Sequence, residues 1–212
     1  MNYLRRHIIT PLLSIGFGMA ISLPVQAEEQ IEAVPLYTQQ ELIALINNNQ
    51  HLARVKADEC QLVKDIEARA EIMALPSYQF LYGDMLAYAV CVDRDVELGL
   101  YYMKSAAEQG LAAALEQLGR YYDKGQLVQA DKALAVTYLR EAAALGNLKA
   151  QMRLVDLFNR GFGSPRDYED AYRWLFHSAV ADKQLHQQIQ TSLAKLAEKM
   201  PDSVVKRARL PI

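Results

Sequence analysis

Residues 114–146 read ALEQLGRYYDKGQLVQADKALAVTYLREAAALG, and this stretch decides the fold of the chain. Ala114 and Leu118 stand four residues apart, so they share one face of a first helix. Asp131 is placed to accept hydrogen bonds from the free N–H groups that open a second helix. Gly146 follows that helix at a position where a left-handed residue commonly ends one. The stretch therefore predicts two helices joined by a turn.

The same pattern recurs along the chain with a fixed period. Matching side chains stand 36 positions apart, as in Asp95, Asp131 and Asp167, in Tyr102, Tyr138 and Trp174, and in Ala107, Ala143 and Ala179. A period in this range indicates stacked helical repeats, in which each unit buries its apolar face against the next. We therefore expect an all-α, right-handed superhelix of antiparallel helix pairs. The expected helices cover 78–88, 95–109, 112–123, 132–145, 149–160 and 168–181.

These residues resemble the Sel1-like repeat, a relative of the TPR, whose pattern is A-x-x-x-L-G-x-x-Y-x-x-G, then Asp, then A-A-x-x-G. The second unit matches from Ala114 to Gly146. The third unit departs from the pattern at Val155 and Asp182, where the family has Gly, and the first unit has Ala89 in place of the loop Gly. The resemblance implies a TPR-like solenoid, which presents surfaces to partners rather than a fixed chemistry.

Composition and charge narrow the possible functions. The chain has 212 residues, of which 51% are hydrophobic and 23% are charged, as in an ordinary globular protein. The formal net charge is −2, so no bulk positive field favours nucleic acid or an anionic membrane. We therefore expect no nucleic-acid partner.

The first residues have the pattern of a secretory signal peptide. Two arginines precede an uncharged apolar run over 8–23, and Val25-Gln26-Ala27 resembles a small-residue cleavage site. A retained membrane anchor is the alternative, but the run is shorter than the roughly 20 residues that a spanning helix needs, and it contains Pro11. We expect residues 1–27 to be removed, which leaves a mildly acidic exported protein.

Four segments follow from these signals. They are a signal peptide over 1–27, an N-terminal helical segment with an incomplete leading repeat over 28–76, three repeats over 77–182, and a capping helix with a basic tail over 183–212. Thr38 and Glu41 form a capping box that predicts a helix over 39–47. The apolar spacing after Asp182 predicts the capping helix over 184–199, and we expect the tail over 204–212 to be mobile.

Cys60 and Cys91 are the two cysteines of the chain. In an oxidising compartment an even pair indicates a disulfide. We expect Asp58 to cap a helix over 59–74, which puts Cys60 near its start, and Cys91 in the turn of the next unit. Both cysteines would then lie at the same end of neighbouring units. Two buried free thiols are the alternative, and metal binding is disfavoured because no CxxC or histidine cluster accompanies them.

The sequence contains no pattern typical of catalysis. His51, His177 and His186 are not spaced to act together on one helix face. The glycine-rich run 161–165 joins two expected helices and lacks the preceding strand and following Lys of a phosphate loop. We therefore predict no catalytic residue, no metal site and no cofactor.

A solenoid buries its repeated residues, so partners contact the positions that vary between units. On the first helices of the units these include Gln117, Arg120 and Arg153. The N-terminal segment has more apolar residues than one short helix needs, and the tail is basic. The candidate partner-binding residues outside the repeats are Leu36, Tyr37, Leu42, Ile46, Lys206, Arg207 and Arg209.

Over essentially its full length the chain resembles the periplasmic repeat proteins of sodium-driven polar flagellar motors. The stretches that carry this resemblance are 36–42, 58–70 and 76–86. It implies a non-enzymatic component of a ring around the flagellar basal body, near the outer membrane. It also implies MotY as a partner and a role in placing the PomA/PomB stator, through the periplasmic part of PomB.

Two other functions stay open at this point. One is an exported Sel1-like enzyme of the penicillin-binding or β-lactamase-like type, whose members carry a cysteine pair in each repeat. The second and third units of this chain have no cysteine, which argues against it. The other is an envelope adaptor protein with a different client.

Overall fold

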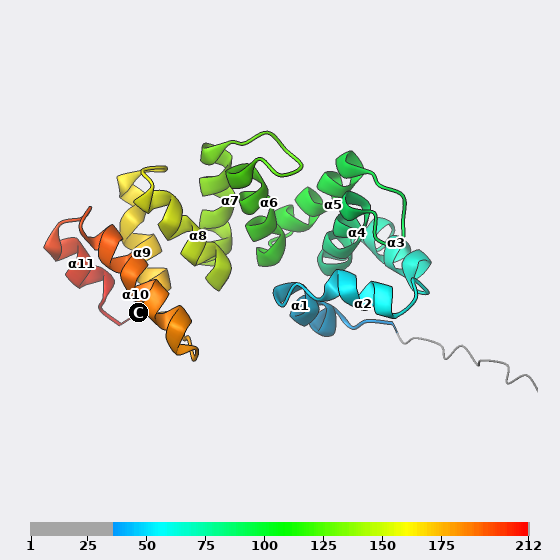
Figure 1. The fold of residues 1–212 in the computed structure, drawn as a ribbon, viewed down its shortest axis with the longest axis horizontal. Coiled ribbons are helices and arrows are strands. Elements are labelled where there is room, and N and C mark those ends of the chain that lie inside the picture. The colour runs from blue at the N-terminus through cyan, green and yellow to red at the C-terminus, as the bar shows by residue number, and fades with distance from the viewer. Residues whose placement is uncertain (1–35, 212) are drawn as a thin grey trace, which may run out of the picture. The chain divides into compact units, whose positions relative to one another are not determined.

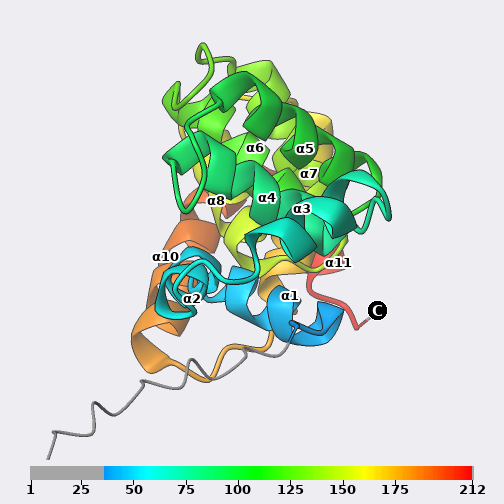
Figure 2. The same ribbon diagram turned by 90° about the vertical axis from the view of Figure 1, so that its right-hand side faces the viewer.

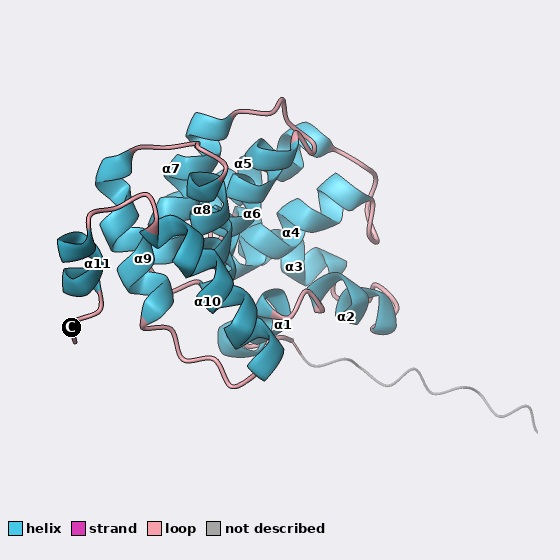
Figure 3. Cartoon of the chain, turned by 60° about the vertical axis from the view of Figure 1, so that its left-hand side comes forward, coloured by secondary structure: helices cyan, strands magenta, loops and turns pink. Residues whose placement is uncertain are grey.

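The computed structural model describes residues 36–211, and these belong to one compact unit. The predicted signal peptide over 1–27 lies outside the described residues. The described part contains eleven α-helices and one short 3-10 helix, and no β-strand. Helices joined by loops make up this whole part (Figure 3). The prediction of an all-α fold is confirmed.

Three helix pairs form the centre of the chain (Figure 1). They are α4 (Pro76–Tyr88) with α5 (Val96–Glu108), α6 (Ala112–Lys124) with α7 (Lys132–Ala144), and α8 (Leu148–Asn159) with α9 (Tyr168–Phe176). The two helices of the first two pairs pack extensively on each other, and α7 also packs on α8. Each pair therefore buries its apolar face against its neighbour, as the period of the sequence predicts.

Local side-chain chemistry sets where these helices begin and end. The Asp95 carboxylate accepts from the Leu98 N–H at 2.9 Å, and the Asp131 carboxylate accepts from two N–H groups of α7. Gly125 closes α6 in the left-handed region with φ 68°. An Asp side chain can bond the free N–H groups that open a helix, and Gly adopts the left-handed conformation that ends one without a steric penalty. The sequence therefore places these boundaries within a residue or two.

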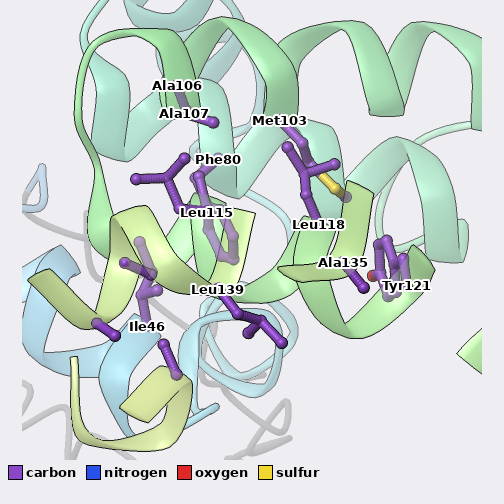
Figure 4. Packing of buried hydrophobic residues seen from close by; sticks show 14 of the residues in the cluster. Ile46, Phe80, Met103, Ala106, Ala107, Leu115, Leu118, Tyr121, Ala135 and Leu139 are labelled. Carbon is purple, nitrogen blue, oxygen red and sulfur yellow. The ribbon is translucent and has the colours of Figure 1, made fainter. Parts of the chain in front are cut away.

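Small residues let the paired helices approach closely. A Cβ on Gly83 would lie 2.7 Å from the carbonyl oxygen of Gly99, so the two helices would have to shift apart to accept it. A Cβ on Gly119 would lie 2.6 Å from the side chain of Leu139. Leu139 and Ala135 of the facing helix are fully buried (Figure 4). The helices therefore pack through backbone as well as side-chain contacts.

The third repeat ends earlier than the sequence predicts. α9 stops at Phe176, whereas the expected helix extends to 181. The Ser178 hydroxyl donates to the carbonyl oxygen of Trp174 at 2.9 Å and also bonds the side chain of Gln151. This local bonding competes with continued helix, and Asp182 then caps α10 by accepting from the N–H of Leu185.

The N-terminal segment differs from the prediction in its second part. α1 (Gln39–Asn47) begins at the Thr38 cap as expected, but an unpredicted helix α2 (His51–Ala57) follows it. The expected helix over 59–74 is shortened to α3 (Val63–Glu71). Asp58 does not cap it, because its carboxylate accepts hydrogen bonds from Tyr37 and Arg54.

The N-terminal helices lie on one side of the stack. α1 and α2 both contact α4 and lie together below it (Figures 1 and 2). The Tyr78 hydroxyl of α4 donates to the carbonyl oxygen of Tyr37, and His51 of α2 bonds Asp84 of α4. These contacts make the segment part of the core of the fold.

The C-terminal segment contains two helices. α10 (Lys183–Ala197) packs on α8 and α9, as the predicted capping helix should. The prediction of a mobile tail is wrong for its first part, because α11 (Asp202–Ala208) packs on α9. Arg207 forms an ion pair with Glu169 of α9, and Arg209 donates to the Tyr172 hydroxyl at 2.8 Å. The two helices together therefore resemble an incomplete fourth unit.

None of the helices of residues 36–211 combines the length and the apolar character that a membrane crossing requires.

Candidate functional site

Helix α8 presents a charged stripe between α6 and α10. Lys149, Arg153, Asp156 and Arg160 stand four, three and four residues apart, so they share one face of the helix. α8 contacts both α6 and α10, and Figure 1 shows it between them. The stripe therefore forms a ridge with a hollow on either side.

The hollow between α6 and α8 is the more charged of the two. One part has a volume of about 490 Å³ and is lined by Asn49, Glu116, Gln117, Arg120, Lys149 and Arg153. The adjoining part, of about 450 Å³, is lined by Asp123, Lys124, Lys149, Met152, Arg153, Asp156 and Arg160. Because Lys149 and Arg153 line both parts, they form one surface, which we call the α6–α8 groove.

Cationic side chains outnumber carboxylates in this groove. Its lining residues include five Lys or Arg side chains and three Asp or Glu side chains. Each carboxylate is paired with an arginine. Arg153 Nε lies 2.6 Å from Glu116 Oε1 and Arg160 lies 2.9 Å from Asp123, both across the groove, while Arg160 also lies 2.9 Å from Asp156, four residues earlier on the α8 side. The excess charge of the groove is therefore positive.

Asp123 is held ionised by its neighbours. Burial alone would raise the pKa of this carboxyl, but hydrogen bonds from Lys132 and Arg160 outweigh burial and lower the pKa below its ordinary value. The Nζ of Lys132 lies 2.8 Å from Asp123 Oδ1. Asp123 therefore fixes Arg160 and Lys132 on the wall of the groove.

Two cations of the groove pair with neutral groups rather than carboxylates in the described part of the chain. Lys149 Nζ donates to the carbonyl oxygen of Asn47, the last residue of α1, at 2.7 Å. Arg120 donates to the side-chain oxygens of Gln126 and Gln117 at 2.9 and 2.6 Å. These contacts position both cations without neutralising them.

The hollow between α8 and α10 is rich in amides and hydroxyls. It has a volume of about 600 Å³ and is lined by Asp156, Asn159, Arg160, Gln184, Gln187, Gln188, Thr191, Ser192 and Lys195. It shares Asp156 and Arg160 with the α6–α8 groove. The two hollows therefore meet along the ridge of α8, and we call the second one the amide hollow.

A buried polar network supports the α6 wall of the groove. Asp84 Oδ1 accepts from Gln117 Nε2 at 3.2 Å, and Gln117 also donates to the Tyr121 hydroxyl at 2.7 Å. Burial is the main cause that raises the pKa of Tyr121, which keeps its hydroxyl protonated. The Arg120 guanidinium stacks 4.8 Å from the centre of the Tyr121 ring. The network therefore fixes the orientation of Gln117 and Arg120.

The structure brings together the three predicted partner-binding residues of the repeats. Gln117, Arg120 and Arg153 all line the α6–α8 groove. Sequence reasoning missed Lys149, although the signal was present. Lys149 stands 36 residues after Ala113, so a small residue in one unit is a cation in the next.

Most of the predicted N-terminal docking residues are not on the surface. Tyr37, Leu42 and Ile46 are buried, with at most 4% of each residue exposed, so the prediction that they form an exposed docking surface is wrong. They pack in the core where α1 meets α4. Leu36 is 43% exposed and remains a candidate.

The basic tail lies on the C-terminal helices and contributes nothing to the groove. Arg207 is paired with Glu169, and Arg209 lies over the rings of Tyr172 and Phe176. Lys206 is exposed on α11. Two of the three basic side chains are therefore engaged in holding α11 on α9.

The predicted disulfide is present. Cys60 and Cys91 are bonded, with their Cα atoms 5.5 Å apart. It links the turn before α3 to the loop after α4, so it ties the irregular N-terminal segment to the first repeat. Both cysteines lie in the left-handed region, at φ 62°.

The geometry of this surface suits binding. Residues 36–211 contain no group of three or more His, Cys, Asp or Glu side chains arranged to hold a metal ion. His51 is buried against Asp84, while His177 ends α9 and His186 lies in α10, and both are exposed. The α6–α8 groove and the amide hollow instead offer cations held in place by their neighbours and many hydrogen-bonding groups.

A family comparison defines the class of protein. The model of the Sel1 repeat matches residues 76–111, 112–147 and 148–176. These segments coincide with the pairs α4–α5, α6–α7 and α8–α9. The chain therefore contains three Sel1 repeats.

A curated relative defines the family more narrowly. The chain is 60% identical over 176 residues to the sodium-type polar flagellar protein MotX of Vibrio parahaemolyticus serotype O3:K6 (strain RIMD 2210633), and the match covers 83% of each chain. The chain belongs to the family of that protein.

Solved structures are similar in fold. The protein c5321, a protective antigen of uropathogenic Escherichia coli strains with an SLR fold, is 20% identical with a TM-score of 0.51, over 80% of this chain and 35% of that one. A Sel1 repeat protein from Oxalobacter formigenes is 22% identical with a TM-score of 0.49, over 69% of this chain and 96% of that one. The first of these supports the Sel1-like repeat fold alone.

Proposed function

We propose that this protein is a non-enzymatic scaffold of the sodium-driven polar flagellar motor. It acts in the periplasm, in a ring with MotY around the basal body, and helps to recruit the PomA/PomB stator. The observation that carries this proposal is the 60% identity to a sodium-type polar flagellar protein over most of both chains. An exported protein is consistent with the signal-peptide pattern of residues 1–27 and with the Cys60–Cys91 bond.

The structural features of the chain support a binding role over a catalytic one. The Sel1-like enzymes considered above carry a cysteine pair in each repeat, whereas the second and third repeats here have none. The polar groove offers fixed cations and amides, with no nucleophile activated by a base among its lining residues. Turnover of the β-lactam nitrocefin by the purified protein would contradict this part of the proposal.

Genetic complementation tests the proposal directly. Deleting the gene in its own bacterium should abolish swimming driven by the polar flagellum while leaving the filament in place. Wild-type chain supplied from a plasmid should restore it. Tagged protein should appear in the periplasmic fraction and co-purify with basal bodies, MotY and PomB. Normal swimming of the deletion strain in sodium-containing medium would overturn the proposal.

A further inference from the structure

The α6–α8 groove has a positive excess charge on a protein that is otherwise acidic. Without residues 1–27 the chain has 21 basic and 25 acidic residues. The groove reverses this balance, with five basic and three acidic lining side chains. A local field opposite in sign to the whole molecule favours partners whose contacting segment is negative.

We propose that the α6–α8 groove and the amide hollow together bind an extended acidic peptide segment of a partner protein. The acidic side chains of that segment pair with Lys149, Lys124 and Arg120, and its backbone runs on across the ridge of α8 into the amide hollow. This inference rests on the proposed scaffold function, since it names the kind of partner segment that the scaffold holds.

The arrangement of charge favours a segment over a single small anion. Lys124 and Lys149 lie on different helices, and the carboxylates of Asp123 and Asp156 are interleaved with the cations. A small anion that contacted several of these cations at once would also lie close to Asp123 or Asp156, whose negative charge would repel it. A chain with separated carboxylates places each of them next to a cation and its neutral residues next to Asp123 and Asp156.

The lining of the hollows favours an extended chain over a helix. Met152 is the one apolar side chain among the lining residues of the α6–α8 groove and the amide hollow. An amphipathic helix binds through an apolar face, and its backbone groups are already hydrogen-bonded internally. An extended peptide leaves its N–H and C=O groups free for side chains such as Gln187, Gln188 and Asn159.

The N-terminal helices give the groove a fixed end. Asn49 lines the groove beside Arg120, and Lys149 bonds the carbonyl oxygen of Asn47. The end of α1 therefore lies beside the groove, held by a contact between residues 102 positions apart. The end of α1 therefore closes one side of the α6–α8 groove and restricts the directions from which a partner segment can enter it.

The test is fluorescence anisotropy on the purified exported chain. The probe is a short labelled peptide in which Glu alternates with Ser, and the matched peptide carries Gln in place of each Glu. We expect the Glu peptide to bind and the Gln peptide to bind at least about threefold more weakly, as exposed charge pairs contribute modestly. Equal binding of the two peptides, or no binding of either, would overturn the inference.

Paired variants locate the site. Lys124→Gln with Lys149→Gln should weaken binding of the Glu peptide by about threefold to tenfold, whereas Asp156→Asn should strengthen it. Lys56→Gln with Lys104→Gln removes the same charge from exposed sites on α2 and α5, and should change binding less than about twofold. If both double variants weaken binding equally, or if inorganic phosphate competes as well as the peptide does, the groove is not the site.

Circular dichroism and thermal unfolding of each variant confirm that the fold is intact. The failure of this inference is distinguishable from failure of the proposed function. If the Glu peptide does not bind while the wild-type chain restores swimming to the deletion strain, the groove inference is wrong and the motor role stands. If the wild-type chain is not needed for swimming, the motor role is wrong whatever the peptide does.

Discussion

The Nε2 atom of His51 lies 2.7 Å from Oδ2 of Asp84, and both side chains are almost completely buried. This contact joins α2 of the irregular N-terminal segment to α4 of the first repeat. The other carboxylate oxygen of Asp84 accepts from Gln117, so the same residue links α2, α4 and α6. A buried carboxyl group is tolerated only when its hydrogen-bonding capacity is met, and here side chains of two other helices, α2 and α6, meet it.

We expect His51→Ala to destabilise the protein strongly. It would leave Oδ2 of Asp84 without its hydrogen-bond partner in α2, and an unsatisfied buried polar group costs about 1–3 kcal/mol, to which the loss of the buried ring adds. Urea unfolding followed by circular dichroism measures the loss. His186→Ala is the matched control, because His186 is exposed on α10 and its removal should change stability by less than about 0.5 kcal/mol. Equal effects of the two variants would contradict the importance of the pair.

The disulfide gives a second prediction. Cys60→Ser and Cys91→Ser should each lower the unfolding free energy by similar amounts, about 3–4 kcal/mol, because either change opens the same loop. The double variant should be no less stable than the single ones. Urea unfolding with and without reductant gives the values, and mass spectrometry of unreduced fragments shows the link. Alkylation of both thiols without reductant would show that the bond does not form.

Glycines at the helix contacts give a third prediction. Gly83→Ala should cost about 1–3 kcal/mol or more, since the added Cβ would lie 2.7 Å from the backbone oxygen of Gly99 and the helices would have to separate. Gly146→Ala meets open space, and its φ of 82° strains only the local backbone, so we expect about 1 kcal/mol. Thermal unfolding compares the two. A smaller effect at Gly83 than at Gly146 would argue against close α4–α5 packing.

The three repeats could be predicted because each boundary has a local cause in the sequence. Asp131 caps α7 and Gly125 ends α6, and neither depends on distant contacts. The N-terminal segment could not be predicted in the same way. Glu59 and Cys60 have φ values of 50° and 62°, a conformation that the sequence would signal only with Gly or Asn. Their turn is held by long-range contacts such as the disulfide to Cys91.

The candidate site was predictable in part, for a related reason. Gln117, Arg120 and Arg153 vary between units, and the repeat register alone places them on the first helices, where they line the groove. The contact of Lys149 with Asn47 depends on how α1 folds back onto the stack, which no local pattern encodes. The same folding back buries Leu42, whose apolar spacing is equally consistent with an exposed docking face and with a packed one.

Burial of α1 gives a fourth prediction. Leu42→Ala should destabilise the protein by about 2–5 kcal/mol, because Leu42 is fully buried and its removal leaves a cavity in the core. Ile43→Ala, at the neighbouring exposed position, should change stability by less than about 0.5 kcal/mol. Urea unfolding distinguishes them. If Leu42→Ala kept full stability but lost motor assembly, Leu42 would be a docking residue after all.

The pairing of Asp123 gives a prediction for the pH dependence of stability. Burial opposes ionisation of this carboxyl, but hydrogen bonds from Lys132 and Arg160 outweigh it, so its pKa in the folded protein is lower than in the unfolded chain. A carboxyl with a lowered pKa stabilises the fold at pH values above its unfolded pKa of about 4, and this contribution is lost as the pH falls through the folded pKa. Asp123→Asn should therefore be less stable than wild type near neutral pH, and the difference should shrink as the pH falls below about 4.

Urea unfolding of both proteins across that range measures the difference, with Asp93→Asn, at an exposed loop position, as the control for loss of one negative charge. A difference that stays constant or grows with falling pH would show that the ion pairs of Asp123 do not stabilise this wall of the groove.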